Sequence, residues 1–172
     1  MTTPTLTIRK AEPADLDTLE ELREEAVAWL ASKGLEQWQP GQPRVPTRAT
    51  TEDAIARSVC HLAYDPHGQL VGTITVDDRA DPEFWSPAEQ VEPALYVHRM
   101  IVPLRARGHE CGRRLLAWAM ELARAKGCTW LRLDAWKSNP ELHRYYVAQG
   151  FEHLRTVDLA HRGSGSLFQR KL

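Results

Sequence analysis

The stretch ALYVHRMIVPLRARGHECGRRLL, which runs from Ala94 to Leu116, is the most informative part of the chain. Its order predicts an apolar strand, a tight loop rich in arginine and glycine, and the start of a helix near Cys111. The first N–H groups of a helix have no intrahelical partner and lie at the positive end of its dipole, which suits an anion. The loop is therefore either a polyanion site or a solvated basic face. Four arginines crowd it: Arg105, Arg107, Arg113 and Arg114.

The spacing within this loop narrows the choice of anion. The sequence from Arg107 to Gly112, RGHECG, resembles the R-x-x-G-x-G/A loop of the GNAT acetyltransferases, which cradles the pyrophosphate of coenzyme A. In that family the arginine follows a strand-terminal valine by five residues, as Arg107 follows Val102. Two positions depart from the pattern: Glu110 replaces the middle glycine, and Pro103 comes one residue early. We expect the carboxylate of Glu110 to repel a diphosphate.

A second motif downstream carries the same resemblance. GNAT proteins have an asparagine seven residues before a tyrosine, and a Gly-Phe pair begins four residues after that tyrosine. Asn139, Tyr146, Gly150 and Phe151 match this pattern. Asn139 is also a good helix cap before Pro140, so each residue alone has an ordinary structural explanation. Two motifs in the expected order are harder to obtain by chance, and the resemblance spans about residues 8–172.

The resemblance implies one α/β (α+β) domain over residues 1–172 with the GNAT fold. This fold has a central mixed, mostly antiparallel sheet flanked by helices, in the order β-α-α-β-β-β-α-β-α-β-β. Apolar periodicity, caps and turn residues independently predict the elements. The expected strands are Leu6–Arg9, Cys60–Tyr64, Leu70–Val76, Ala94–Val102, Trp130–Ala135, Phe151–Val157 and Leu167–Lys171. The expected helices are Pro13–Lys33, Thr51–Ser58, Cys111–Lys126 and Pro140–Gln149, and a long loop is expected over Asp77–Pro93.

The composition is typical of a single globular domain. At 172 residues, 42% apolar and 26% charged, the chain suits one sizeable core and is short for two domains. The net charge of -1 argues against a nucleic-acid-binding module. No apolar run has the length of a membrane span and the start lacks a signal-peptide core, so we expect a cytoplasmic protein. The cysteines, which are Cys60, Cys111 and Cys128, predict neither a disulfide framework nor a metal site.

Two residues are the candidates for the chemistry. Tyr146 stands where the family places the general acid that protonates the departing thiolate, although it could be a core aromatic. His98 is the best candidate base, because a histidine holds the matching position in one member of the family and titrates near neutrality, but a strand histidine can also be structural. Alternation along the strand predicts that His98 shares a face with Met100 and Val102. Glu92 and Asp134 are weaker candidates. No Ser-His-Asp or Cys-His arrangement is evident, which favours direct transfer, and Cys111 is expected to be apolar filler.

The resemblance implies acetyl-CoA as the acetyl donor, with no metal. Backbone groups of the central strand are expected to meet the pantetheine arm. The expected cofactor-binding residues are Met100, Ile101, Val102, Arg107, Gly108, His109, Glu110, Cys111, Gly112, Arg113, Asn139 and Tyr146.

The acceptor is expected to be a small, cationic primary amine. The stretch from Asp77 to Glu92 holds six acids against one base and includes Phe84 and Trp85. Carboxylates beside aromatic rings attract organic cations, although such a stretch could equally be a solvated acidic loop. The expected acceptor contacts are Trp38, Trp85 and Glu92. The rival function is a catalytically silent acyl-CoA-binding domain of the same fold, and the sequence is compatible with either a monomer or a homodimer.

Overall fold

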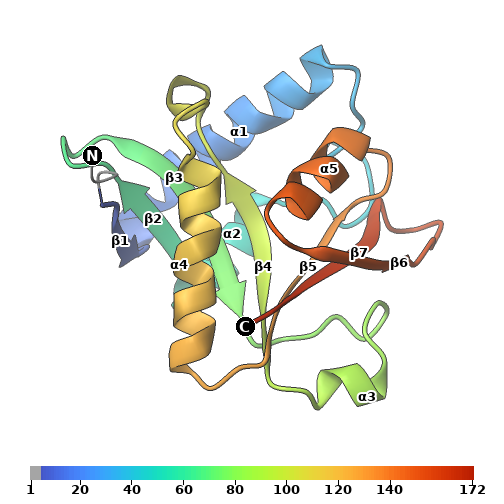
Figure 1. Cartoon of the computed structure of the whole chain (residues 1–172). Helices are drawn as coiled ribbons and strands as arrows, with labels where there is room; N and C mark the ends of the chain where they lie inside the picture. The colour runs from blue at the N-terminus through green and yellow to red at the C-terminus, as the bar shows by residue number, and fades with distance from the viewer. Residues whose placement is uncertain (1–4) are drawn as a thin grey trace.

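The computed structural model describes residues 5–172 as a central sheet with helices on both faces (Figure 1). The strands are β1 (Thr7–Lys10), β2 (Cys60–Tyr64), β3 (Leu70–Asp77), β4 (Ala94–Ile101), β5 (Trp130–Trp136), β6 (Glu152–Thr156) and β7 (Ser164–Lys171). The α-helices are α1 (Leu16–Ser32), α2 (Arg48–Ala56), α3 (Pro87–Gln90), α4 (Cys111–Ala125) and α5 (Pro140–Ala148). Short 3-10 helices cover Pro13–Asp15 and Leu104–Ala106. Among residues 5–172, no helix combines the length and the apolar character needed to cross a membrane.

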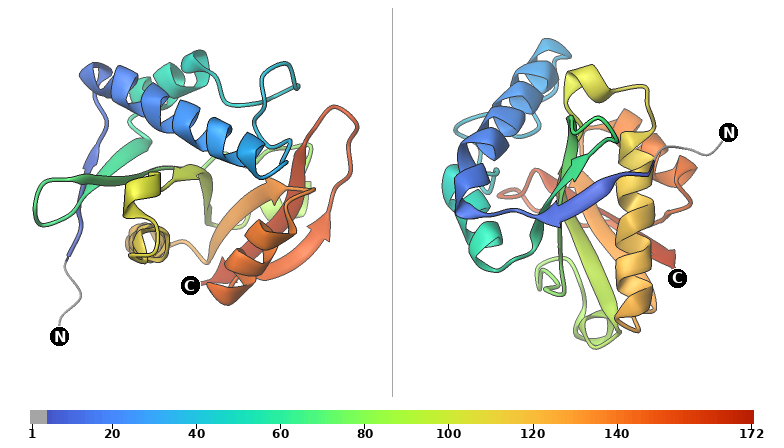
Figure 2. Two further views of the ribbon diagram at one scale, coloured as in Figure 1. Left: turned by 90° about the horizontal axis from the view of Figure 1, so that it is seen from above. Right: turned by 90° about the vertical axis from the view of Figure 1, so that its left-hand side faces the viewer.

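The seven strands lie in the order β1-β2-β3-β4-β5-β7-β6. Strands β4 and β5 run parallel, and the other neighbouring pairs in the described chain run antiparallel. Helices α1 and α2 cover one face, and α4 and α5 cover the other (Figure 2). This arrangement confirms the expected fold class.

Strands β4 and β5 diverge partway along their length. Their pairing runs from Ala94 opposite Trp130 to Val97 opposite Leu133 and then stops, although both strands continue. An opening therefore forms inside the sheet, and no strand of residues 5–172 pairs with the backbone edges that face it. A ligand with its own amide groups could satisfy these edges.

A bulge in β4 lies beside this opening. Thr75 is opposite His98 and Thr73 is opposite Ile101, so β4 carries one extra residue between these pairs. Arg99 adopts a left-handed backbone conformation there, with φ of 45°. An extra residue bends a strand and interrupts side-chain alternation. The expectation that His98 shares a face with Met100 is therefore wrong: His98 and Ile101 lie on the face of Thr73 and Thr75, which α2 covers.

The apolar face of α4 anchors the helix on the sheet. Its buried side chains recur at helical spacing: Cys111, Leu115, Leu116, Ala119, Met120 and Ala123. Gly72 in β3 permits a close approach, because a Cβ there would lie 2.7 Å from the Leu115 side chain and 3.3 Å from the carbonyl of Ile101. This packing holds the N-terminal end of α4 next to the end of β4.

Three elements differ most from expectation. Helix α2 begins at Arg48, three residues before the expected Thr51, because the Thr47 side chain accepts from the N–H of Thr50 and caps the helix there. The loop from Asp77 to Pro93 contains α3, which a capping box starts: Ser86 Oγ accepts from the N–H of Glu89, and the Glu89 carboxylate accepts from the N–H of Ser86 at 2.7 Å. Strand β7 begins at Ser164, earlier than the expected Leu167, because the small polar residues before Leu167 pair with β5 and β6.

Candidate active site

A cavity of about 550 Å³ lies at the N-terminal end of α4, between α1, β4 and α5, and we call it the α4 cavity. Most of the expected cofactor-binding residues line it. They are Met100, Ile101, Val102, Arg107, Gly108, Glu110, Cys111, Gly112, Arg113 and Asn139. Two do not: His109 points into a separate cavity that Arg105 and Arg114 also line, and Tyr146 lines the adjoining cavity described below.

The loop before α4 turns tightly through two left-handed residues. Gly108 has φ of 81° and Glu110 has φ of 56°. The second value explains why the family pattern has glycine there, because side chains with a Cβ disfavour this conformation. The Glu110 carboxylate is ion-paired with Arg113, Oε2 to Nη2 at 2.8 Å, and this pairing lowers the pKa of Glu110. The loop thus carries one internal pair of charges at the mouth of the cavity.

Arg107 is held by an aromatic ring instead of a carboxylate. Its guanidinium carbon lies 3.7 Å from the ring centroid of Trp29 in α1. Partial burial lowers the pKa of Arg107, and no ion pair or side-chain hydrogen bond fixes the guanidinium within residues 5–172. Stacking on a ring leaves the edge of the guanidinium free to donate to an anion. Trp29 was not among the sequence candidates, because its spacing indicated only the apolar face of α1.

A second cavity, of about 250 Å³, occupies the opening between β4 and β5, and we call it the β4–β5 cavity. It is lined by His98 from β4, Asp134 from β5 and Tyr146 from α5. Trp38, in the loop after α1, lines this cavity and the α4 cavity, as do Gln37, Met100 and Leu142. The two cavities therefore adjoin one another along Trp38 and Met100.

Tyr146 is buried at this junction. Its ring packs against Phe151 and Phe168, with centroids 5.8 and 5.7 Å away. Burial raises the pKa of Tyr146, so the phenol stays protonated at neutral pH. Its hydroxyl has no hydrogen-bond partner within residues 5–172, and the residue lines the β4–β5 cavity. A protonated donor is thus available to a bound group.

The adjacent Tyr145 is a site residue that sequence reasoning missed. It lines the α4 cavity, and a Cβ at Gly112 would lie 2.5 Å from its hydroxyl oxygen. Glycine at position 112 therefore permits α5 to approach the start of α4. The one sequence signal for Tyr145 was that neighbouring residues of a helix face different directions. In the fold, Tyr145 lines the α4 cavity and Tyr146 lines the adjoining cavity.

His98 is oriented by a buried carboxylate. Its Nε2 lies 3.1 Å from Oδ1 of Asp77, whose Oδ2 accepts from Nη1 of Arg57 at 3.1 Å. Burial alone would raise the pKa of Asp77, but the hydrogen bonds from His98, Arg57 and the N–H of Arg79 outweigh it, and the pKa is lowered. Asp77 therefore remains ionised and holds the imidazole ring. Nothing in the sequence links residues 77 and 98, because their contact depends on the pairing of β3 with β4.

Asn139 both caps α5 and joins it to the loop after α1. Its Oδ1 accepts from the N–H of Leu142 at 3.2 Å, and its Nδ2 donates to Oε1 of Gln37 at 2.8 Å. Both side chains are buried. Asn139 thereby closes one wall of the α4 cavity.

The acidic stretch from Asp77 to Glu92 is not a free negative surface. Asp81 and Glu83 pair with Arg162, at 2.8 and 2.5 Å. Glu89 binds Arg155 through both oxygens. Five of the six acids are engaged in this way, in the pairs Asp77–Arg57, Asp81–Arg162, Glu83–Arg162, Glu89–Arg155 and Glu92–Arg132. These five carboxylates are therefore not free to attract a cationic acceptor.

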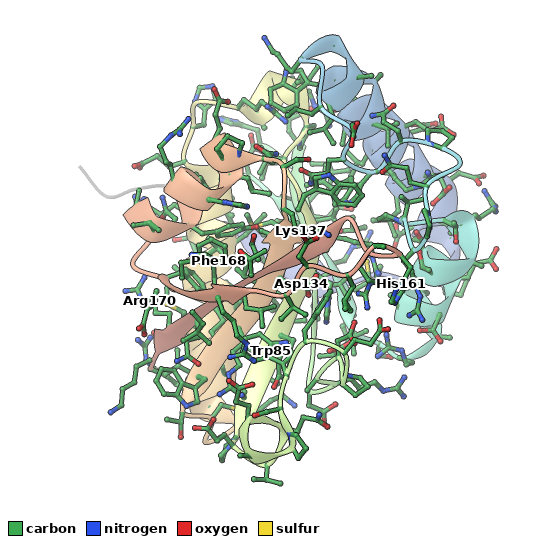
Figure 3. All side chains as sticks on the ribbon, turned by 90° about the vertical axis from the view of Figure 1, so that its right-hand side faces the viewer. Trp85, Asp134, Lys137, His161, Phe168 and Arg170 are labelled. Atoms are coloured by element: carbon green, nitrogen blue, oxygen red, sulfur yellow. The ribbon has the colours of Figure 1, made fainter. Side chains whose placement is uncertain are left out.

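Trp85 and Glu92, two of the three expected acceptor contacts, lie away from both cavities. Trp85 is 1% exposed and packs against Tyr96, with its ring below the guanidinium of Arg132. Figure 3 shows it on the α3 side of Asp134. Glu92 accepts from the buried Arg132 at 2.6 Å and from Nε1 of Trp130 at 2.9 Å. Both residues hold the α3 segment against the sheet. Of the three expected acceptor contacts, only Trp38 lines the two cavities.

Comparison with known proteins identifies the family. The model of the acetyltransferase (GNAT) family matches residues 19–151, and the chain belongs to this family. No curated protein sequence matches the chain. Within residues 5–172, no group of three or more His, Cys, Asp or Glu side chains could hold a metal ion.

Solved structures of similar fold agree with this family. A GNAT-family acetyltransferase from Listeria monocytogenes superposes with a TM-score of 0.81 at 23% identity, over 97% of this chain and 95% of that chain. One from Streptococcus agalactiae gives 0.79 at 22% identity, over 97% and 95%. The PaiA N-acetyltransferase from Thermoplasma acidophilum, solved in complex with coenzyme A, gives 0.70 at 21% identity, over 98% and 99%.

Proposed function

We propose that this GNAT-family protein transfers the acetyl group of acetyl-CoA directly to the primary amine of a small acceptor. The observation that carries the proposal is the meeting of two cavities beside Tyr146 and His98. A donor in one cavity and an acceptor in the other would bring their reacting groups together, which is the main requirement for transfer without an acyl-enzyme.

The α4 cavity suits coenzyme A. The free N–H groups at the start of α4, together with Arg107 and Arg113, provide donors for a pyrophosphate. The unpaired backbone edge of β4 near Met100 provides partners for the amides of a pantetheine arm. The PaiA protein, which shares the fold, holds coenzyme A in its structure. Glu110 is the one feature that opposes a polyanion, and its pairing with Arg113 reduces that opposition.

The residues at the junction have the properties that acetyl transfer needs. Acetyl-CoA would supply an activated thioester. His98 accepts a proton from the ammonium group of the acceptor, and Asp77 keeps the imidazole in position. The free amine then forms a bond with the carbonyl carbon while the bond from that carbon to sulfur breaks. Tyr146 donates its proton to the departing sulfur, which leaves as a thiol, and the second proton that the nitrogen loses as the amide forms restores the Tyr146 phenol.

The acidic stretch from Asp77 to Glu92 no longer supports a cationic acceptor, because five of its six acids are paired with arginines. The proposal keeps a small primary amine, which carries a positive charge until His98 deprotonates it. The cytoplasmic location, the absence of nucleic-acid and membrane partners, and the choice between monomer and homodimer remain predictions from the sequence.

The rival function is a silent domain that binds acyl-CoA without turnover. Glu110, where the family pattern has glycine, is the observation that favours it. Oriented His98 and an unpartnered Tyr146 hydroxyl favour the enzyme, because a domain that only binds needs neither.

Two measurements separate these functions. In a thermal melt, coenzyme A at about a hundred times its dissociation constant should stabilise the fold by about 2.7 kcal/mol. Arg107→Glu should abolish this shift, whereas Arg124→Glu, an exposed position on α4 that lines neither cavity, should keep it. With acetyl-CoA and a panel of polyamines, aminoglycosides, aralkylamines, amino acids and peptides, we expect amine-dependent release of thiol. A thermal shift without any thiol release would support the silent domain, and no shift at millimolar coenzyme A would exclude both functions.

A further inference from the structure

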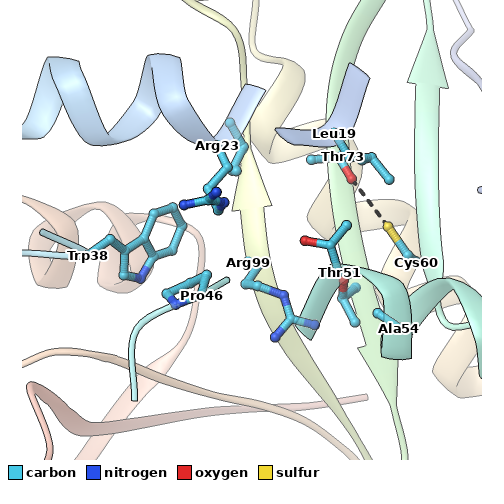
Figure 4. A pocket seen from close by; sticks show the side chains of 11 residues that line it. Leu19, Arg23, Trp38, Pro46, Thr51, Ala54, Cys60, Thr73 and Arg99 are labelled. Atoms are coloured by element: carbon cyan, nitrogen blue, oxygen red, sulfur yellow. Dashed lines mark hydrogen bonds between the residues drawn. The ribbon is translucent and has the colours of Figure 1, made fainter. Parts of the chain in front are cut away.

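Arg99 is a cation for which residues 5–172 provide no partner. It occupies the left-handed position of the β4 bulge, next to His98, and lines the β4–β5 cavity. It also lines a small neighbouring cavity of about 30 Å³ with Arg23, Trp38 and Pro46, where its side chain reaches from β4 past Thr51 (Figure 4). Within residues 5–172 its guanidinium makes no ion pair and no hydrogen bond, and burial lowers its pKa. Arg99 is half-buried, and a partly desolvated charge without a partner costs stability, so its retention points to a partner from outside the chain.

The carboxylates around Arg99 already form hydrogen bonds or ion pairs with other groups. Asp77 holds His98 and Arg57, and Asp81 pairs with Arg162. Asp134 accepts a hydrogen bond from Ser164. In the smaller cavity, Arg23 is neutralised by Glu20, at 2.5 Å, and Glu20 also accepts from Thr51.

A second cation faces the same space. Arg44, in the loop between α1 and α2, lines the β4–β5 cavity and makes no ion pair within residues 5–172. The cavity therefore presents two unpaired guanidinium groups, whereas both of its carboxylates have partners. The planar fork of a guanidinium matches a carboxylate in two parallel hydrogen bonds.

We infer that the acceptor carries a carboxylate close to its amine and that Arg99 binds this carboxylate while His98 takes the proton of the ammonium group. The inference rests on the proposed function and names the class of its substrate: a free amino acid or a small molecule with the same pair of groups. The bulge explains the placement, because the extra residue lets two consecutive side chains, His98 and Arg99, reach one cavity. A base and a carboxylate-binding group on adjacent residues suit an amine and a carboxylate attached to the same carbon.

The inference can be tested with matched acceptors. Each amino acid of a panel of apolar, aromatic and acidic members is compared with its amide and with the amine that lacks the carboxyl group. We expect kcat/KM for the acid to exceed that for the amide by about ten- to a hundredfold, the value of one hydrogen-bonded charge pair. Arg99→Gln should remove this preference through KM, and Arg99→Lys should restore part of it. Arg124→Gln, on the exposed face of α4, is the matched control and should keep the wild-type preference.

Each outcome separates the inference from the proposed function. Turnover of amides and simple amines as good as that of the acids would overturn the inference and leave the acetyltransferase standing. Weaker coenzyme A binding by Arg99→Gln, measured by thermal shift, would also overturn it, because Arg99 would then serve the donor. The melting temperature of Arg99→Gln should equal or exceed that of the wild type, since an unpaired, half-buried charge is removed. Thiol release with no amine at all would defeat the proposed function itself.

Discussion

The α4 cavity and the β4–β5 cavity lie side by side, yet they are built in different ways. Much of the α4 cavity comes from one continuous segment, from Met100 to Arg113, whose backbone path follows from local turn and helix chemistry. The β4–β5 cavity gathers Trp38, His98, Asp134, Tyr146 and Arg162 from five separate parts of the chain. A continuous motif can be recognised in a sequence, whereas a gathered site depends on pairing that only the fold creates.

The charges show this contrast most clearly. Counted along the sequence, the acids from Asp77 to Glu92 look like a negative surface. In the fold they bind arginines that are distant in the sequence: Glu83 binds Arg162, 79 positions later, and Glu89 binds Arg155, 66 positions later. The excess charge beside His98 is instead Arg99, which has no ion pair within residues 5–172 and which a sequence count does not distinguish from any other arginine.

The largest effect we predict lies where the two cavities meet. Tyr146→Phe removes one hydroxyl and little volume, so packing and coenzyme A binding should be nearly unchanged. If the phenol protonates the departing sulfur, kcat should fall about a hundred- to ten-thousandfold. Steady-state thiol release gives kcat, and a thermal shift with coenzyme A gives the binding control.

Tyr64→Phe is the matched control for this substitution. Tyr64 is a strand tyrosine whose hydroxyl accepts from Arg9 at 2.9 Å, and it lines neither cavity. Its loss should leave kcat unchanged. An unchanged kcat in Tyr146→Phe would make Tyr146 a core aromatic and would leave the junction without its acid.

An intermediate effect concerns the ion pairs that fasten the acidic stretch. Arg155 donates both of its terminal nitrogens to Glu89, which lowers the pKa of Glu89 to about 2. Because this pKa is depressed in the folded state, the pair stabilises the fold fully above about pH 4.5, and the contribution is lost as the pH falls towards 2. Glu89→Gln should therefore cost about 1–3 kcal/mol at pH 7, and the difference from the wild type should shrink below pH 4.5.

Urea unfolding at pH 7 and at pH 3 measures this difference directly. Glu121→Gln, which breaks an exposed pair with Arg124 on α4, is the comparison and should change stability little at either pH. A Glu89→Gln difference that grew on acidification would show that the pair is not what holds the segment.

The smallest effect is expected in the continuous motif. Glu110→Gly relieves a left-handed backbone conformation and removes a carboxylate from the mouth of the α4 cavity, but it also frees Arg113. The loss of the carboxylate and the release of Arg113 both favour an anion, so coenzyme A should bind about two- to tenfold more tightly. Isothermal titration would record this change. Weaker binding would mean that the Glu110–Arg113 pair positions the loop, and glycine would then not be the better residue.

The fold was predictable because its signals are local. The periodicity and caps placed most strands and helices within a few residues, and the resemblance that the two motifs carry implied their arrangement in a mixed sheet. The capping box at Ser86 was also present in the sequence, so α3 could have been found. The bulge at Arg99 had no such signal, because a left-handed arginine in a strand follows from the pairing of β3 with β4 and from no local preference.

For the site, the sequence predicted the residues that a motif contains. Arg107, Gly108 and Gly112, which the loop motif contains, line one cavity in the fold. The sequence could not show that Asp77 orients His98, nor that Glu92 is already paired with Arg132. Both contacts join segments that are far apart in the chain. It also could not exclude Trp85, since aromatic residues in an acidic loop look exposed until the α3 segment folds over them.

The central claim is that a donor bound at the start of α4 reaches the acceptor cavity beside Tyr146. A crystal structure of the protein with coenzyme A bound would test it most directly. We predict the pyrophosphate at the first N–H groups of α4, next to Arg107 and Arg113, and the sulfur within hydrogen-bond distance of the Tyr146 hydroxyl. A pyrophosphate bound elsewhere, or a sulfur that ends out of reach of Tyr146, would contradict the account.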